Sequence, residues 1–253
     1  MSVNVDSVRA QIDIYAKELR LSGILGNYSK LAEEATERDI SHEGYLLACL
    51  EEELRTRKEN CLKRNMKAAK FPSLKTLETF DLTRQPGLSK SKLKALSESD
   101  FVAKKENVIL LGNSGTGKSH IATALGVSAI SNGYRVRFIS AVALSQELLK
   151  AQDEHRLPAV LKSYDKYDLV IVDELGYIGF GAGGSPLFQF FAERYERGSV
   201  IVTTNLEFSK WTEVFTDNTM TAALLDRLTH HASILLFQGE SYRFMESSKN
   251  LKR

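Results

Sequence analysis

Hydrophobic residues in the first 70 positions recur every three or four residues, which is the spacing of one face of an α-helix. The set comprises Val8, Ile12, Tyr15 and Leu19 in a first helix, and Tyr45, Leu46, Cys49, Leu50 and Leu54 in a second helix that begins near Ser41. Pro72, Pro86 and Gly87 then interrupt this pattern. We therefore predict a helical N-terminal domain over residues 1–70 and a linker over residues 71–91.

From residue 92 onward, short apolar runs alternate with segments of helical periodicity. The predicted strands are 108–111, 136–139, 169–172, 199–204 and 232–237. Continuous apolar runs are typical of strands that are buried on both faces, as in a parallel sheet. Strands that alternate with helices predict a three-layer α/β/α domain with a parallel sheet, here over residues 92–253.

The composition is that of a globular protein, with 43% hydrophobic and 26% charged residues. Cys49 and Cys61 are the two cysteines, so neither a disulfide framework nor a zinc site is expected. The N-terminal residues lack the basic start and apolar run of a signal peptide, and no apolar stretch reaches the ~18 residues of a membrane helix. We expect a cytoplasmic protein with no membrane partner.

Charge is distributed unevenly along the chain. Residues 54–105 contain fourteen basic and five acidic residues, a net charge of +9, which leaves −7 for the rest of a chain whose net charge is +2. Such asymmetry favours a polyanionic partner such as DNA. The alternative is a solvated surface and linker.

One motif predicts nucleotide binding. The run Gly112-Asn113-Ser114-Gly115-Thr116-Gly117-Lys118-Ser119 matches G-x4-G-K-[ST], follows a predicted strand and opens a predicted helix. Glycines allow backbone N–H groups to face phosphate oxygens, and the positive end of the following helix adds to their effect. In this motif Lys118 contacts the β- and γ-phosphates of ATP, and the Ser119 hydroxyl ligates Mg²⁺.

Two carboxylates follow the predicted strand 169–172. Asp173 is placed to hold Mg²⁺ through its water shell, and Glu174 to act as a general base on the attacking water. The acidic pair favours water as the nucleophile, and hence hydrolysis over transfer to a small acceptor. A simple acidic turn is the alternative.

Three further polar residues are candidates for the same site. Asn205 follows the strand 199–204, which should lie beside the phosphate loop, and its amide is suited to orient water or contact the γ-phosphate. A helix-capping role is the alternative. Arg227 and Arg243 are candidates for stabilising the γ-phosphate, although each has the alternative of a surface ion pair.

Taken in order, these motifs resemble the IstB family, ATP-binding helpers of insertion sequences that are related to DnaC-type helicase loaders among the AAA+ ATPases. The matching runs are the phosphate loop, Val-Asp-Glu-Leu-Gly-Tyr (172–177), Arg-Tyr-Glu-Arg-Gly-Ser (194–199), Thr-Thr-Asn (203–205), Leu-Leu-Asp-Arg-Leu (224–228) and Gly-Glu-Ser-Tyr-Arg (239–243). The resemblance extends from about residue 80 to residue 243. The N-terminal helices are compatible with it but less diagnostic.

The resemblance implies specific roles for these residues. Lys118 and Ser119 are the Walker A contacts, and Asp173 and Glu174 are the Walker B pair. Asn205 matches sensor 1, Arg227 an arginine finger that acts on the ATP of a neighbouring subunit, and Arg243 a sensor 2 arginine. The chain ends ten residues after Arg243, which is too few for the helical lid that normally carries sensor 2.

The family implies a function: ATP-dependent assembly on double-stranded DNA as a homo-oligomer that recruits and stimulates a partner transposase. Three alternatives stay open at this point. They are a DnaC-like helicase loader with the same ATPase residues, a small-molecule phosphotransferase, and a DNA-binding protein whose phosphate loop is a relict. The residues that contact adenine are not identified, and Phe80 and Phe101 are candidates.

Overall fold

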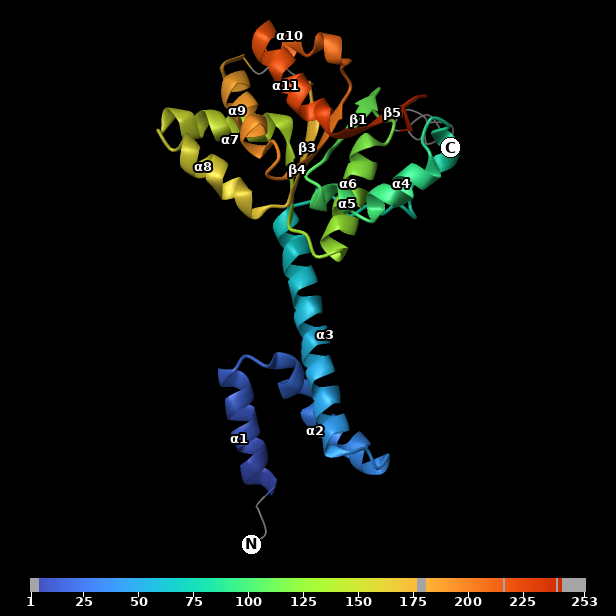
Figure 1. Cartoon of the computed structure of the whole chain (residues 1–253), viewed down its shortest axis with the longest axis vertical. Helices are drawn as coiled ribbons and strands as arrows, with labels where there is room; N and C mark the ends of the chain where they lie inside the picture. The colour runs from blue at the N-terminus through green and yellow to red at the C-terminus, as the bar shows by residue number, and fades with distance from the viewer. Residues whose placement is uncertain (1–4, 177–180, 216, 240, 243–253) are drawn as a thin grey trace, which may run out of the picture. The chain divides into compact units, whose positions relative to one another are not determined.

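The computed structural model describes residues 5–176, 181–215, 217–239 and 241–242 (Figure 1). It divides into two compact units, Met1–Arg64 and Asn65–Arg253. The sequence predicts three segments: the N-terminal domain (1–70), the linker (71–91) and the ATPase domain (92–253). These boundaries remain predictions. Among the described helices, none combines the length and apolarity that a membrane crossing requires.

The first unit is helical, as predicted. It contains α1 (Val5–Glu18), α2 (Ser22–Glu37) and most of α3 (His42–Ala69). The sequence interpretation named the first and third of these helices and missed α2. Gly23 lies in the first turn of α2, where an added Cβ would lie 2.7 Å from the backbone of α3 at Glu53. Glycine is required there for close helix packing, although it weakens the helical signal in the sequence.

The apolar periodicity of the first unit predicted α1 and α3 correctly but not most of their buried positions. Tyr15, Leu19, Leu50 and Leu54 are 48–65% exposed. The buried apolar side chains described in this unit are Ala16, Tyr28 and Cys49, and of these the prediction had included Cys49. Periodicity therefore identifies these segments as helices but does not show which of their faces is buried.

The second unit contains a five-stranded sheet with helices on both faces (Figure 1). The strands are β1 (Asn107–Gly112), β2 (Val136–Ser140), β3 (Leu169–Leu175), β4 (Ser199–Thr204) and β5 (Ala232–Phe237). The α-helices are α4 (Lys90–Ser97), α5 (Asp100–Ala103), α6 (Lys118–Ser131), α7 (Ala141–Asp153), α8 (Leu157–Ser163), α9 (Gly184–Arg194), α10 (Thr212–Phe215) and α11 (Asn218–His230). Short 3-10 turns are η1 (Leu82–Arg84), η2 (Tyr164–Lys166), η3 (Gly181–Gly183) and η4 (Phe208–Lys210).

The strand order is β2-β3-β4-β1-β5, and all four pairings are parallel. The predicted parallel α/β/α architecture is therefore confirmed. Because β4 lies between β3 and β1, the ends of these three strands meet at the centre of one edge of the sheet.

Alternate residues of the strands belong to two separate cores. Val108 and Leu110 of β1 pack with α6, whereas Ile109 packs in the cluster that contains residues of α7, α9 and α11. The two-residue period of a strand explains this division. Phe101, one of the two candidates for contact with adenine, is 4% exposed and belongs to the α6 core.

Candidate nucleotide site

The phosphate loop connects β1 to the amino end of α6, as the motif requires. Gly115 and Gly117 have φ angles of +77° and +100°, which residues with a side chain rarely adopt. A Cβ at Gly117 would lie 2.6 Å from the Phe80 ring, so close packing also requires glycine there. This contact places Phe80, the other adenine candidate, directly against the loop.

Lys118 lies inside the loop and is only 9% exposed. Its Nζ donates hydrogen bonds of 2.7 Å to the carbonyl oxygens of Gly112 and Asn113. The Thr116 hydroxyl also donates to the Asn113 carbonyl oxygen. The ammonium group is therefore held at the concave centre of the loop, where a phosphate would lie.

Asp173 at the end of β3 accepts two hydroxyl hydrogen bonds on its Oδ1 atom. One comes from Ser119, at 2.8 Å, and the other from Thr203 of β4, at 2.6 Å. Asp173 is 8% exposed, and Thr203 is fully buried. The Ser119–Asp173 bond joins the phosphate loop to β3 across the intervening β4.

These oxygens fit a Mg²⁺ ion that also binds nucleotide phosphate. The Ser119 hydroxyl would be a direct ligand of the ion, and Asp173, which accepts a hydrogen bond from that hydroxyl, would hold the ion through its water shell. Mg²⁺ commonly takes one or two protein ligands and fills its other positions with water and phosphate oxygens. Such an ion would neutralise charge on the phosphates.

Glu174 differs from Asp173 in both backbone and exposure. Its φ angle is +62°, and its side chain is exposed at the end of the strand. The pairing of β3 with β4 shifts register between Val172 and Leu175, and the Glu174 N–H donates 2.8 Å to the Thr203 hydroxyl. Thr203 therefore holds both members of the acidic pair, a role that the sequence interpretation did not assign. The signal was a threonine at the end of a buried strand.

Asn205 follows β4 directly and is exposed. β4 is the neighbour of β1, as the sequence interpretation expected. Asn205 therefore leaves the sheet between the strand that bears Asp173 and the strand that precedes the phosphate loop.

Arg227 lies at the opposite end of the sheet. It shares a small cleft with Asn107, the first residue of β1, and the carbonyl of the next residue, Leu228, accepts a hydrogen bond from the Asn107 side chain. The length of β1 separates Asn107 from Gly112 by about 17 Å at ~3.3 Å per residue. Arg227 is therefore not positioned to reach the phosphate loop of its own chain. Arg243 lies outside the described residues.

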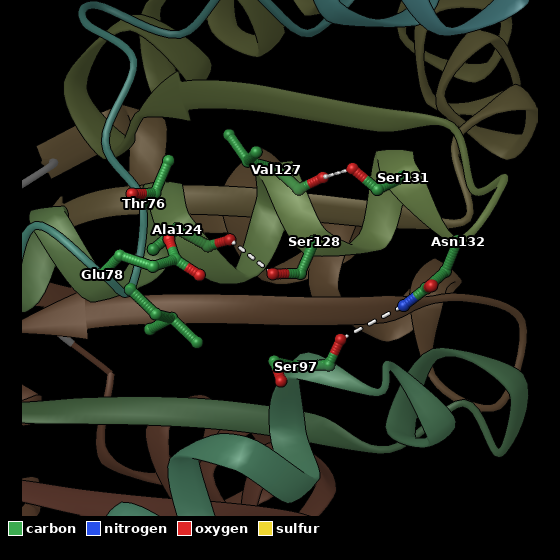
Figure 2. Close-up of a pocket in the computed structure, with 9 residues that line it drawn as sticks. Thr76, Glu78, Ser97, Ala124, Val127, Ser128, Ser131 and Asn132 are labelled. Atoms are coloured by element: carbon green, nitrogen blue, oxygen red, sulfur yellow. Dashed lines mark hydrogen bonds between the residues drawn. The ribbon is translucent and has the colours of Figure 1, made fainter.

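A separate cavity of about 310 Å³ lies along the carboxyl half of α6 (Figure 2). Its lining includes Thr76, Glu78, Ser97, Ser128 and Asn132. None of the predicted nucleotide-binding residues lines it, so the proposed chemistry belongs to the loop and strand ends rather than to this cavity.

A phosphate loop after β1, an acidic pair at the end of β3 and this sheet order define a P-loop fold of the AAA+ type. Residues 14–250 match the family described as IstB-like ATP binding protein, and the chain belongs to that family.

The chain is similar to two proteins named as insertion-sequence ATP-binding proteins. The IS21 protein of Pseudomonas aeruginosa is 36% identical over 240 residues, 94% of this chain and 91% of that protein. The IS5376 protein of Geobacillus stearothermophilus is 35% identical, over 94% and 96% of the two chains. The fold resembles AMPPCP-bound DnaA from Aquifex aeolicus, with a TM-score of 0.53 and 22% identity over 70% of this chain and 54% of that one.

Proposed function

We propose that this protein is an ATP-hydrolysing helper of transposition. In this proposal it assembles on double-stranded DNA when ATP is bound, and it recruits and stimulates a partner transposase. ATP hydrolysis then controls disassembly. The observation that carries the ATPase part is the hydrogen bond between Ser119 and Asp173, which brings the phosphate loop and the acidic pair into one site.

In the proposed site, Lys118 holds the phosphates, and Ser119 and Asp173 hold Mg²⁺. Glu174 is the proposed general base because its exposed carboxylate adjoins Asp173. Asn205 is proposed to orient the attacking water or contact the γ-phosphate.

The variant Glu174→Gln tests hydrolysis and disassembly together. We expect it to bind ATP normally, to release phosphate at least about 100-fold more slowly, and to remain assembled on DNA. The control is Glu193→Gln, which changes an exposed glutamate in a surface ion pair with Arg197. Phosphate release and light scattering report the two effects, and normal turnover by Glu174→Gln would remove this residue from the mechanism.

The position of Arg227 supports action on a neighbouring subunit. It adjoins Asn107, and the length of β1 places Asn107 about 17 Å from Gly112 of the loop. Arg227 is therefore suited to complete the site of another copy, as an arginine finger does. Binding of ATP at such an interface favours assembly.

A mixing experiment tests this arrangement. Arg227→Ala keeps an intact acidic pair, whereas Glu174→Gln keeps an intact arginine. We expect each variant alone to be inactive and a mixture to recover part of the turnover, because one subunit supplies what the other lacks. Arg197→Ala, at an exposed arginine, is the control and should behave as wild type. A mixture as inactive as its components would contradict action in trans.

The basic segment 54–105 supports the DNA-binding part. Its exposed cations include Lys63 and Arg64 in the first unit, and Lys90 and Lys94, one helical turn apart on α4, in the second. Phosphate contacts of this kind give affinity with little sequence preference and a steep salt dependence.

Two double variants, Lys63→Ala with Arg64→Ala and Lys90→Ala with Lys94→Ala, test each unit separately. Each lost phosphate contact should reduce the slope of log affinity against log salt by about 0.9. The matched control replaces Lys150 and Lys162, exposed lysines of α7 and α8 outside the segment. Equal slopes in all three double variants would contradict the assignment of DNA binding to this segment.

The partner is tested by capture. Immobilised protein with ATP and DNA should retain the transposase encoded beside its gene and increase its strand-transfer rate. Retention of the replicative helicase instead would support a DnaC-like helicase loader.

A further inference from the structure

The carbonyl groups of the phosphate loop are held by hydrogen bonds from three parts of the chain. Lys118 holds those of Gly112 and Asn113 from within the loop. The Tyr242 N–H donates 2.9 Å to the Gly115 carbonyl oxygen, and the Gln85 Nε2 donates 3.1 Å to that of Thr116. The loop that faces the nucleotide is therefore held from its outer side by residues distant in the sequence.

Holding a carbonyl fixes the direction of the next N–H group. The peptide unit is planar and trans, so a C=O and the N–H of the following residue point in opposite directions. When Gln85 holds the Thr116 carbonyl, it also fixes the direction of the Gly117 N–H. Of Thr116 and Gly117, the glycine has the less restricted backbone, so this peptide depends on an external hydrogen bond to fix its orientation.

Gln85 is built for this contact. It is 4% exposed and uses both ends of its amide, because Oε1 accepts a 3.1 Å hydrogen bond from the Gln238 N–H just after β5. Its backbone N–H donates to the carbonyl of Leu82, the first residue of η1, and Asp81 caps that turn by accepting from the Thr83 N–H. The backbone of Gln85 is therefore fixed before its side chain reaches the loop.

We propose that Gln85 is a positioning residue for nucleotide binding. It holds the Thr116–Gly117 peptide so that the N–H of Gly117 faces the phosphates, and it joins the loop to the chain after β5. A donor and an acceptor are both needed, which explains an amide rather than a carboxylate. This proposal rests on binding of ATP at the loop.

The test compares Gln85→Met with Asn107→Leu. Asn107 is a buried amide at the other end of β1 that likewise bridges two backbone groups, donating to the Leu228 carbonyl and accepting from the Val200 N–H. Each substitution roughly keeps the side-chain size and removes two hydrogen bonds. If Gln85 had a purely structural role, the two variants should lose similar thermal stability without ligand and should bind nucleotide with similar affinity.

We expect Gln85→Met to bind a fluorescent ATP analogue about tenfold more weakly than Asn107→Leu does, as roughly one lost hydrogen bond implies. The same loss should occur with inorganic tripolyphosphate, since the loop contacts phosphate rather than the base. Gln85→Glu retains the acceptor toward Gln238 but has no donor, so it should lose at least as much affinity and serves if the methionine variant does not fold.

Equal affinities of Gln85→Met and Asn107→Leu for both ligands would overturn the proposal. Lys118→Ala separates this outcome from failure of the underlying site. If Lys118→Ala abolishes binding while Gln85→Met does not change it, the role of Gln85 alone is wrong. Normal binding by Lys118→Ala would instead overturn the nucleotide site itself.

Discussion

Replacing Thr203 with valine tests the geometry of the acidic pair most directly. Valine has nearly the shape of threonine but lacks the hydroxyl, which donates to Asp173 and accepts from the Glu174 N–H. The side chain is fully buried, so water does not readily replace either hydrogen bond. The substitution therefore removes one polar atom on which both carboxylate residues depend.

The structure sets the size of the expected effect. A hydrogen bond to a charged group contributes about 1.5–3 kcal/mol, and an unpaired backbone N–H costs about 1–3 kcal/mol. The left-handed backbone of Glu174, at φ +62°, itself costs of order 1–3 kcal/mol and is held by that N–H. If 1.5–3 kcal/mol of this appears in the transition state, turnover falls by roughly 10–160-fold.

The assay is steady-state phosphate release with saturating ATP and DNA, together with ATP affinity measured separately. We expect kcat to fall by that factor and affinity to change by less than about threefold, because the phosphate loop is intact. Thr221→Val is the control: Thr221 is also buried, and its hydroxyl donates to the carbonyl of Asp217, the residue that caps the start of α11. Wild-type turnover in Thr203→Val would refute the role assigned to this hydroxyl.

Three further predictions concern stability and binding. Burial lowers the pKa of Arg194 to about 10, and its guanidinium donates hydrogen bonds to the carbonyl oxygens of Tyr164 and Ser199. Arg194→Met should therefore lower the free energy of unfolding in urea by about 2–4 kcal/mol, and an unchanged urea midpoint would contradict this. Burial raises the pKa of Glu53, but its hydrogen bonds from Arg57 and the N–H groups that begin α2 outweigh burial and lower it. Because the folded pKa lies below the unfolded one, this stabilisation is present at neutral pH and is lost as pH falls through the folded pKa. Amide-exchange protection of α2 should therefore be greater in wild type than in Glu53→Gln at pH 7, and the difference should narrow below about pH 4; a difference independent of pH would argue against the ionised carboxylate. Lys118→Ala should weaken ATP binding by at least about tenfold in a calorimetric titration, since it removes a buried cation from the loop, and undiminished affinity would refute the assignment.

The strands of the second unit could be predicted from sequence because each is a short apolar run, buried on both faces along most of β1, β3 and β4, although the edge strand β5 leaves Leu236 exposed. The proposed nucleotide site was predicted from the same signal, since the phosphate loop and Asp173 each come directly after such a run. Local sequence patterns are enough to predict a site when the functional residue directly follows the strand that the pattern identifies.

The contacts that support the site were not predictable in this way. Gln85 and Thr116 are 31 positions apart, and Asp173 and Thr203 are 30 apart, so only the folded topology makes them neighbours. The helix α2 was missed for a related reason, because Gly23 is required by packing against α3 and weakens the local helical signal.

The separation between Arg227 and the loop of its own chain has a consequence for enzymology. In a single copy, the phosphate loop lies at one end of β1 and Arg227, the proposed arginine finger, lies at the other. Under the proposed action of Arg227 in trans, specific activity should depend on protein concentration, and a molecule diluted below the point at which copies associate should bind ATP but hydrolyse it slowly.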